Sequence, residues 1–86
     1  MRKKLPEKIQ SLLYLNTIVQ ITDKDEVLIE NCKRLAEYND IFLKIITNNM
    51  TVQIWGSGLK INNYGTSSII VKGVIDSVEI LKSKNR

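Results

Sequence analysis

The chain has 86 residues, of which 43% are hydrophobic and 26% are charged, the balance of one small globular domain rather than of a disordered segment. It contains no histidine and one cysteine, Cys32, which excludes an internal disulfide and a zinc site built from Cys and His. No apolar run reaches the ~20 residues that span a bilayer, and the N-terminal segment lacks a signal-peptide pattern, so we expect a cytosolic protein.

The net charge of +4 is concentrated in two tails. Residues 1–8 hold four Lys/Arg against one Glu, residues 82–86 hold three Lys/Arg, and residues 9–81 hold six Lys/Arg against eight Asp/Glu. A nucleic-acid-binding domain usually gathers its basic residues on a face of the fold, so nucleic acid is an unfavoured partner. The tails are either solvated ends or sites of weak attraction to anionic lipid or an acidic partner, with Arg2, Lys3 and Lys4 as candidate contacts.

Residues 5–16 are predicted to form a short amphipathic helix. Pro6 suits the first helical turn, and apolar residues at helical spacing share one face: Leu5, Ile9, Leu12 and Leu13. Because an isolated helix of this length is marginal in water, it must dock on something. Two sites remain open, the sheet of its own chain and a membrane interface or partner groove.

Two strands are predicted next, at about 17–22 and 27–31, and the polar turn Asp23-Lys24-Asp25 between them indicates a hairpin. Cys32-Lys33-Arg34 is interpreted as a polar corner, and its cysteine as a small structural side chain. Residues 35–38 fit a short strand or a helical turn equally well.

The alternation is clearest between residues 41 and 55. Ile41, Leu43 and Ile45 alternate with Phe42, Lys44 and Ile46, so one face of this strand is predicted to be wholly apolar and the other mixed. Asn48-Asn49 can close a tight hairpin because asparagine tolerates positive φ. In the following strand, the apolar residues Met50, Val52 and Ile54 are predicted to face inward. Thr51, Gln53 and Trp55 then face outward.

Gly56-Ser57-Gly58 is predicted to be a turn, after which Leu59 and Ile61 face inward. Residues 63–68 form the longest predicted loop, and Gly73 indicates a bulge or bend in the strand that follows. Asp76-Ser77 interrupts the last run, as a bulge or as a turn into one more strand.

The predicted fold is mainly β, an antiparallel meander sheet or β-roll of about six to eight short strands with one N-terminal helix. The expected organisation is a basic tail at 1–4, the helix at 5–16, a single β domain at 17–81 and a second basic tail at 82–86. The edge strands of this sheet carry only Lys and Asn residues to hinder pairing with another chain, which also allows self-association by edge pairing.

No catalytic constellation is visible, so we expect no enzyme activity, no cofactor, no metal and no small-molecule substrate. The acidic turn at Asp23 resembles the start of a calcium loop, but Leu28 and Arg34 stand where such a loop needs glycine and glutamate. Without histidine, no serine or cysteine has the usual base. Trp55 and Tyr64 are candidate interaction residues, through a protein interface or base stacking. The alternative for Trp55 is a place beneath the docked helix or in a second core layer.

Several short motifs, in this order and spacing, resemble the YabP/YqfC family of sporulation proteins, and the size and basic N-terminal segment look more like its YqfC branch. They are Ile29-Glu30-Asn31, Glu37-Tyr38, Ile54-Trp55-Gly56 followed by Leu59-Lys60-Ile61, and Ile69 to Ile75 with Gly73. The motif residues carried over from the family are Glu30, Asn31, Glu37, Tyr38, Gly56, Leu59 and Gly73. The chain departs from the family pattern at Cys32, where histidine is frequent, and at Asn49, where glycine is usual.

The resemblance implies a non-enzymatic role in assembling the spore envelope, cortex or coat, within the mother cell. The leading hypothesis places the protein peripherally at the outer forespore membrane. The resemblance also implies a protein partner, a sporulation membrane protein encoded nearby. The alternative hypothesis, from another class, is a small β-barrel-like domain that binds single-stranded nucleic acid, based on the basic pI of about 9.3 together with Trp55 and Tyr64.

Overall fold

The computed structural model describes residues 17–48, 50–63, 65 and 67–82. These residues form six strands and no helix. The strands are β1 (Ile18–Thr22), β2 (Glu26–Glu30), β3 (Cys32–Tyr38), β4 (Phe42–Thr47), β5 (Met50–Asn63) and β6 (Ser68–Lys82). The predicted helix at 5–16 lies outside the described residues, so its existence stays a prediction.

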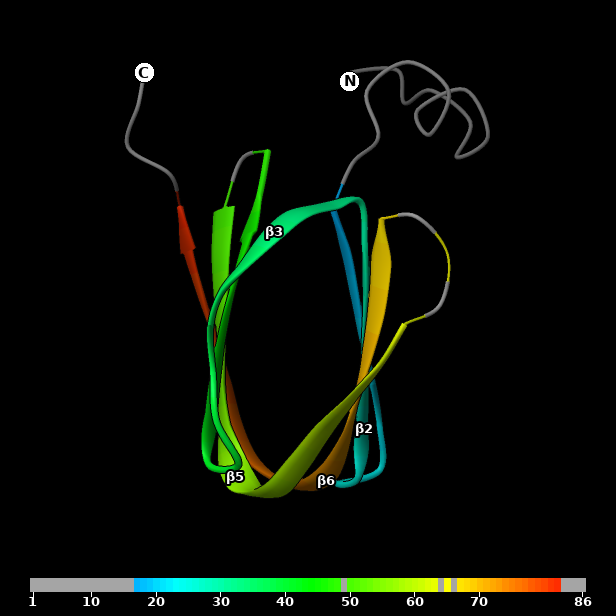
Figure 1. Cartoon of the computed structure of the whole chain (residues 1–86), viewed down its shortest axis with the longest axis vertical. Helices are drawn as coiled ribbons and strands as arrows, with labels where there is room; N and C mark the ends of the chain where they lie inside the picture. Colours follow the sequence, from blue (N-terminus) through cyan, green and yellow to red (C-terminus); the bar gives the residue numbers. More distant parts are fainter. Residues whose placement is uncertain (1–16, 49, 64, 66, 83–86) are drawn as a thin grey trace, which may run out of the picture.

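The strands form one sheet in the order β1-β2-β6-β5-β4-β3, with every neighbouring pair antiparallel. The predicted mainly β, antiparallel fold is confirmed, but a simple meander is wrong, because β2 pairs with β6 rather than with β3. Asn31 has a φ of 68°, a left-handed conformation that asparagine tolerates, and it turns the chain out of β2. The Cys32 amide then donates to the Ser67 carbonyl oxygen at 2.8 Å. Figure 1 shows β3 crossing from the side of β2 to the side of β5.

The long strands β5 and β6 bend together, at the bottom of the view in Figure 1. The predicted turn at Gly56-Ser57-Gly58 is therefore wrong, because β5 continues through it as one bent strand. The pairing of β5 with β6 is irregular at two places in the bend. At the first, Asp76 is an extra residue of β6 between two paired residues, and at the second, Gly73 of β6 lies between two paired residues and has a φ of 140°. The bulge expected at Asp76-Ser77 and the bend expected at Gly73 are both confirmed.

The bend divides the sheet into two halves that face each other across the core. The first half-sheet consists of β1, β2, residues 60–63 of β5 and residues 68–72 of β6. The second half-sheet consists of β3, β4, residues 50–57 of β5 and residues 74–82 of β6. The buried core lies between them: Val27, Ile29, Leu43, Ile45, Val52, Ile54, Leu59, Val71 and Ile75.

Strand β3 differs from the prediction, because Cys32 already belongs to the strand and residues 35–38 continue it. Its pairing with β4 is irregular at two places, around Lys33 and around Ala36. Each irregularity shifts the inward and outward alternation by one residue, which explains why the sequence period does not distinguish a strand from a helical turn here.

Two hairpin turns hold the bend from either side. In the β1-β2 turn, which confirms the predicted hairpin, the carbonyl oxygens of Asp25 and Lys24 accept from the amides of Gly73 and Ile75 at 3.2 and 2.9 Å. In the β3-β4 turn, the Asp40 carbonyl oxygen accepts from the Leu59 amide at 2.9 Å. The bend is thus fixed by backbone hydrogen bonds that come from both halves of the chain.

Candidate interaction surface

Four of the family-motif residues meet at the bend of β5 and β6. The Tyr38 hydroxyl donates to the Leu59 carbonyl oxygen at 3.4 Å, and the Leu59 side chain is buried in the core. Gly56 faces the backbone of Val74, while a β-carbon on Gly73 would lie only 2.6 Å from the Gly58 carbonyl oxygen. These residues therefore have a structural role, which is to let two strands bend while their backbones stay in close contact.

Two further motif residues lie at the corner between β2 and β3. Glu30 ends β2, where it is half-buried and paired with Ile18 and Ser68, and Asn31 makes the left-handed turn. Cys32 follows, with its Sγ 3.4 Å from the Ile29 carbonyl oxygen. Burial raises the pKa of the Cys32 thiol, and a hydrogen bond with the Ile69 backbone partly opposes that rise. A thiol with a raised pKa is a poor nucleophile at neutral pH, which favours a structural role.

Glu37 lies apart from the other motif residues, exposed on β3 and opposite Lys44 of β4. Four of the predicted interaction residues lie outside the described residues, namely Tyr64, Arg2, Lys3 and Lys4. Trp55 is thus the predicted interaction residue that the structure places.

The face that carries Trp55 is the outward side of the second half-sheet, which we call the outer face. Because paired residues of antiparallel strands share a face, the register divides it into three rows. The rows are Phe42, Trp55 and Ser77; Glu37, Lys44, Gln53 and Glu79; and Arg34, Ile46, Thr51 and Leu81. A charged row therefore separates an aromatic row from a row of mixed character.

Trp55 and Phe42 form the most distinctive feature of the outer face. Their ring centroids lie 4.2 Å apart with an interplanar angle of 37°, and 43% of the Trp55 surface remains exposed. Contact with Phe42 fixes one side of the indole, so its position costs little further conformational entropy when a partner covers it. The charged residues nearby carry both signs, Lys44 and Arg34 against Glu37 and Glu79.

A family model described as the YabP family matches residues 15–86, a range that includes all six strands. The chain belongs to the YabP family. The resemblance to YabP/YqfC proteins is thereby confirmed, and membership indicates a sporulation-related protein. No curated protein and no solved structure matches the chain.

Over the described part of this YabP-family chain, no three His, Cys, Asp or Glu side chains come together as metal ligands. Within the same residues no helix has the length and apolar character of a transmembrane helix.

Phe42 is the outer-face residue that sequence reasoning missed in this YabP-family protein. The alternation from Leu43 places Phe42 outward, but its pairing with Trp55 depends on the register of β4 and β5. In the sequence, Phe42 and Trp55 lie at equal distances before and after Asn48-Asn49, so a hairpin centred on these two residues, as predicted, would have paired the two aromatic residues.

Proposed function

We propose that this YabP-family protein is a non-enzymatic sporulation factor that helps to assemble the spore envelope, the cortex or coat, by associating with another protein. The outer face is the proposed association surface, and the half-exposed Trp55 packed against Phe42 is the observation that carries the proposal. Tryptophan is strongly enriched among residues that dominate interface energies, especially where a rim of polar groups surrounds it.

A second contact is available at the edge of the second half-sheet. Residues 77–82 of β6 pair with β5 on one side and have no described strand on the other. The opposite edge, β3, is irregular at two places, which is a common protection against edge pairing. Within the proposal, an extended partner segment or a second copy adds to the β6 edge while the outer face supplies the aromatic anchor.

The proposed location is the mother-cell cytoplasm, peripheral at the outer forespore membrane, with a nearby-encoded sporulation membrane protein as the partner. The basic tails support this part, because Lys and Arg near an anionic membrane each contribute about 1 kcal/mol of attraction. Co-sedimentation with vesicles containing phosphatidylserine tests it, and protein that stays in the supernatant at low salt counts against membrane contact.

Nucleic-acid binding is not proposed. Basic residues on the outer face alternate with Glu37 and Glu79, so the described part of the chain shows no basic track along which a phosphate backbone could bind. Titration with a single-stranded oligonucleotide, carried out beside the protein titrations, tests this alternative.

The experiment uses Trp55 as its own reporter, because it is the one tryptophan of the sequence. Titration with the cytosolic part of the neighbouring membrane protein, and separately self-titration by concentration, should shift Trp55 emission to shorter wavelength and reduce its quenching by acrylamide. Binding, measured by sedimentation, should weaken at least about 30-fold in Trp55→Ala, the ~2 kcal/mol expected of a hot-spot residue.

Gln20→Ala is the control, because Gln20 is an exposed glutamine on the outward side of β1, outside the outer face. Trp55→Ala should also lower the yield of heat-resistant spores in the source organism, whereas Gln20→Ala should not. Full binding and sporulation by Trp55→Ala would remove the outer face from the proposal. Binding of single-stranded oligonucleotide that is lost in Trp55→Ala would replace protein association with the nucleic-acid alternative.

A further inference from the structure

The two half-sheets leave one side of the core open, between β1 and the second part of β6. Ile21 of β1 lies beside Val27 on the core-facing side, and Ile80 of β6 lies beside Val52 on that side. Val27 and Val52 are completely buried, whereas Ile21 and Ile80 are each 52% exposed. Core-facing isoleucines this exposed mark a side of the core that the described strands do not cover.

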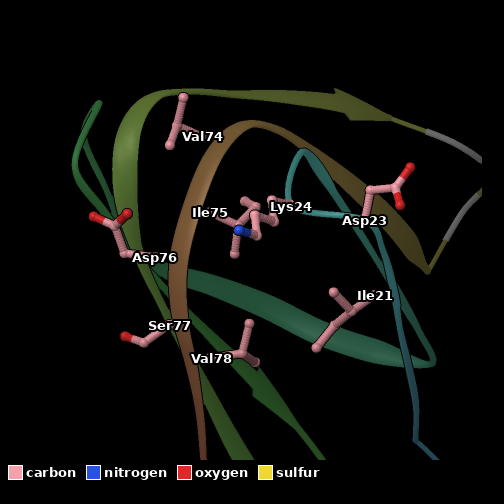
Figure 2. A pocket seen from close by; sticks show the side chains of 8 residues that line it. All are labelled: Ile21, Asp23, Lys24, Val74, Ile75, Asp76, Ser77 and Val78. Atoms are coloured by element: carbon pink, nitrogen blue, oxygen red, sulfur yellow. The ribbon is translucent and has the colours of Figure 1, made fainter.

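A groove of about 590 Å³ lies at this opening. Figure 2 shows Ile21 of β1 and Val78 of β6 facing each other, with Ile75 and Lys24 above Val78 in the view. Three exposed charged residues also line the groove, namely Asp23, Lys24 and Asp76. The groove therefore combines an apolar floor with two acidic groups and one basic group near the β1-β2 turn.

We propose that residues 5–16 of the same chain dock in this groove as an amphipathic helix. This segment joins β1 directly, at the end of the strand opposite the turn. A helix of 12 residues is ~18 Å long, and the five residues of β1 extend ~17 Å, so a helix that runs back along β1 matches the strand in length. Its apolar residues Leu5, Ile9, Leu12 and Leu13 can then cover Ile21 and Val78.

The charges agree with this direction. A helix running back along β1 brings residue 5, and with it Arg2, Lys3 and Lys4, to the turn end of the groove. That end carries the exposed residues Asp23, Asp25 and Asp76, with Lys24 as the one cation of the turn. Opposite charges therefore meet at one end, while apolar surfaces meet along the length.

The test measures thiol reactivity in the full-length chain with Cys32 replaced by alanine. Ile21→Cys reports on the groove, and Gln20→Cys, the neighbouring exposed position on the outward side of β1, reports on open solvent. With the segment docked, Ile21→Cys should react about tenfold more slowly, which corresponds to a docking preference of about 1.4 kcal/mol. Adding Leu12→Asp should abolish the difference, whereas Gln10→Asp, off the apolar stripe, should preserve it.

Equal reactivity of Ile21→Cys and Gln20→Cys overturns the proposal. So does protection that disappears on dilution, which indicates a second copy in the groove, and protection that requires anionic vesicles, which indicates that the segment binds membrane. Because Leu12→Asp could disturb folding, a second measurement uses the pair Leu12→Cys and Ile21→Cys with a short bifunctional thiol reagent. A cross-link within one monomer supports docking, and a yield no higher than for Gln10→Cys with Ile21→Cys overturns it.

Discussion

Gly56 lies so close to Val74 that a β-carbon on Gly56 would overlap the Val74 carbonyl oxygen. The two residues belong to β5 and β6 at the point where both strands bend. Two backbones can approach this closely only where one residue has no side chain, so the shape of the whole sheet depends on glycine at this position.

Gly56→Ala should therefore lower the free energy of unfolding by about 3 kcal/mol, because the backbone of Val74 must move to admit the methyl group. Urea denaturation measures the change. Gly58→Ala is the control: its β-carbon meets nothing within 4 Å, and its φ of 59° should cost only about 1–2 kcal/mol. A Gly56→Ala variant as stable as Gly58→Ala would show that the bend is less tightly packed than described.

Neighbouring residues on β5 should differ sharply in their effect on stability. Ile54 is completely buried, so Ile54→Ala should cost about 2–5 kcal/mol. Trp55→Ala removes the contact with Phe42 from an exposed face and should cost only about 0.5–1.5 kcal/mol. Denaturation of both variants checks the assignment of inward and outward sides, and the reverse ranking would contradict the register of β5.

The stability contributed by Cys32 should depend on pH in the alkaline range. Burial raises the pKa of its thiol above the ordinary value of 9.0, so the folded state holds the proton more tightly than the unfolded state. The contribution is complete below the unfolded pKa and is lost as the pH rises through the folded pKa. The free energy of unfolding of the parent, relative to that of Cys32→Ala, should therefore be constant near neutral pH and should fall above about pH 9. A difference that moves in favour of the parent with rising pH would contradict the burial.

Thr47 should stabilise the β4-β5 hairpin through its hydroxyl. This residue is 2% exposed, and its Oγ1 donates to the Met50 carbonyl oxygen and accepts from the Met50 amide, both at 3.1 Å. Thr47→Val keeps the shape but leaves both backbone groups without these bonds, which should cost about 1–3 kcal/mol. Thr51→Val, on the outer face, is the matched control and should change stability by less than about 0.5 kcal/mol. Equal effects of the two substitutions would count against a role for the Thr47 hydroxyl.

The sequence by itself determined the core-facing side of the central strands, although Ile41, predicted on the same side as Leu43, precedes β4 and is 53% exposed. The alternation around Leu43, Ile45, Val52 and Ile54 depends only on the two-residue period of a strand, and all four are buried. The same alternation places Trp55 outward, as observed. Its role in association stays a prediction, as does the helix at 5–16.

Only the tertiary structure decided how the strands are connected. Local sequence cannot show that Gly73 lies against Gly58, and this contact lets β5 bend through Gly56-Ser57-Gly58 instead of ending there. Nor does local sequence show that Asn31 turns the chain away so that β6, not β3, pairs with β2. Both outcomes depend on backbone contacts between residues far apart in the chain, and such contacts have no period that the sequence displays.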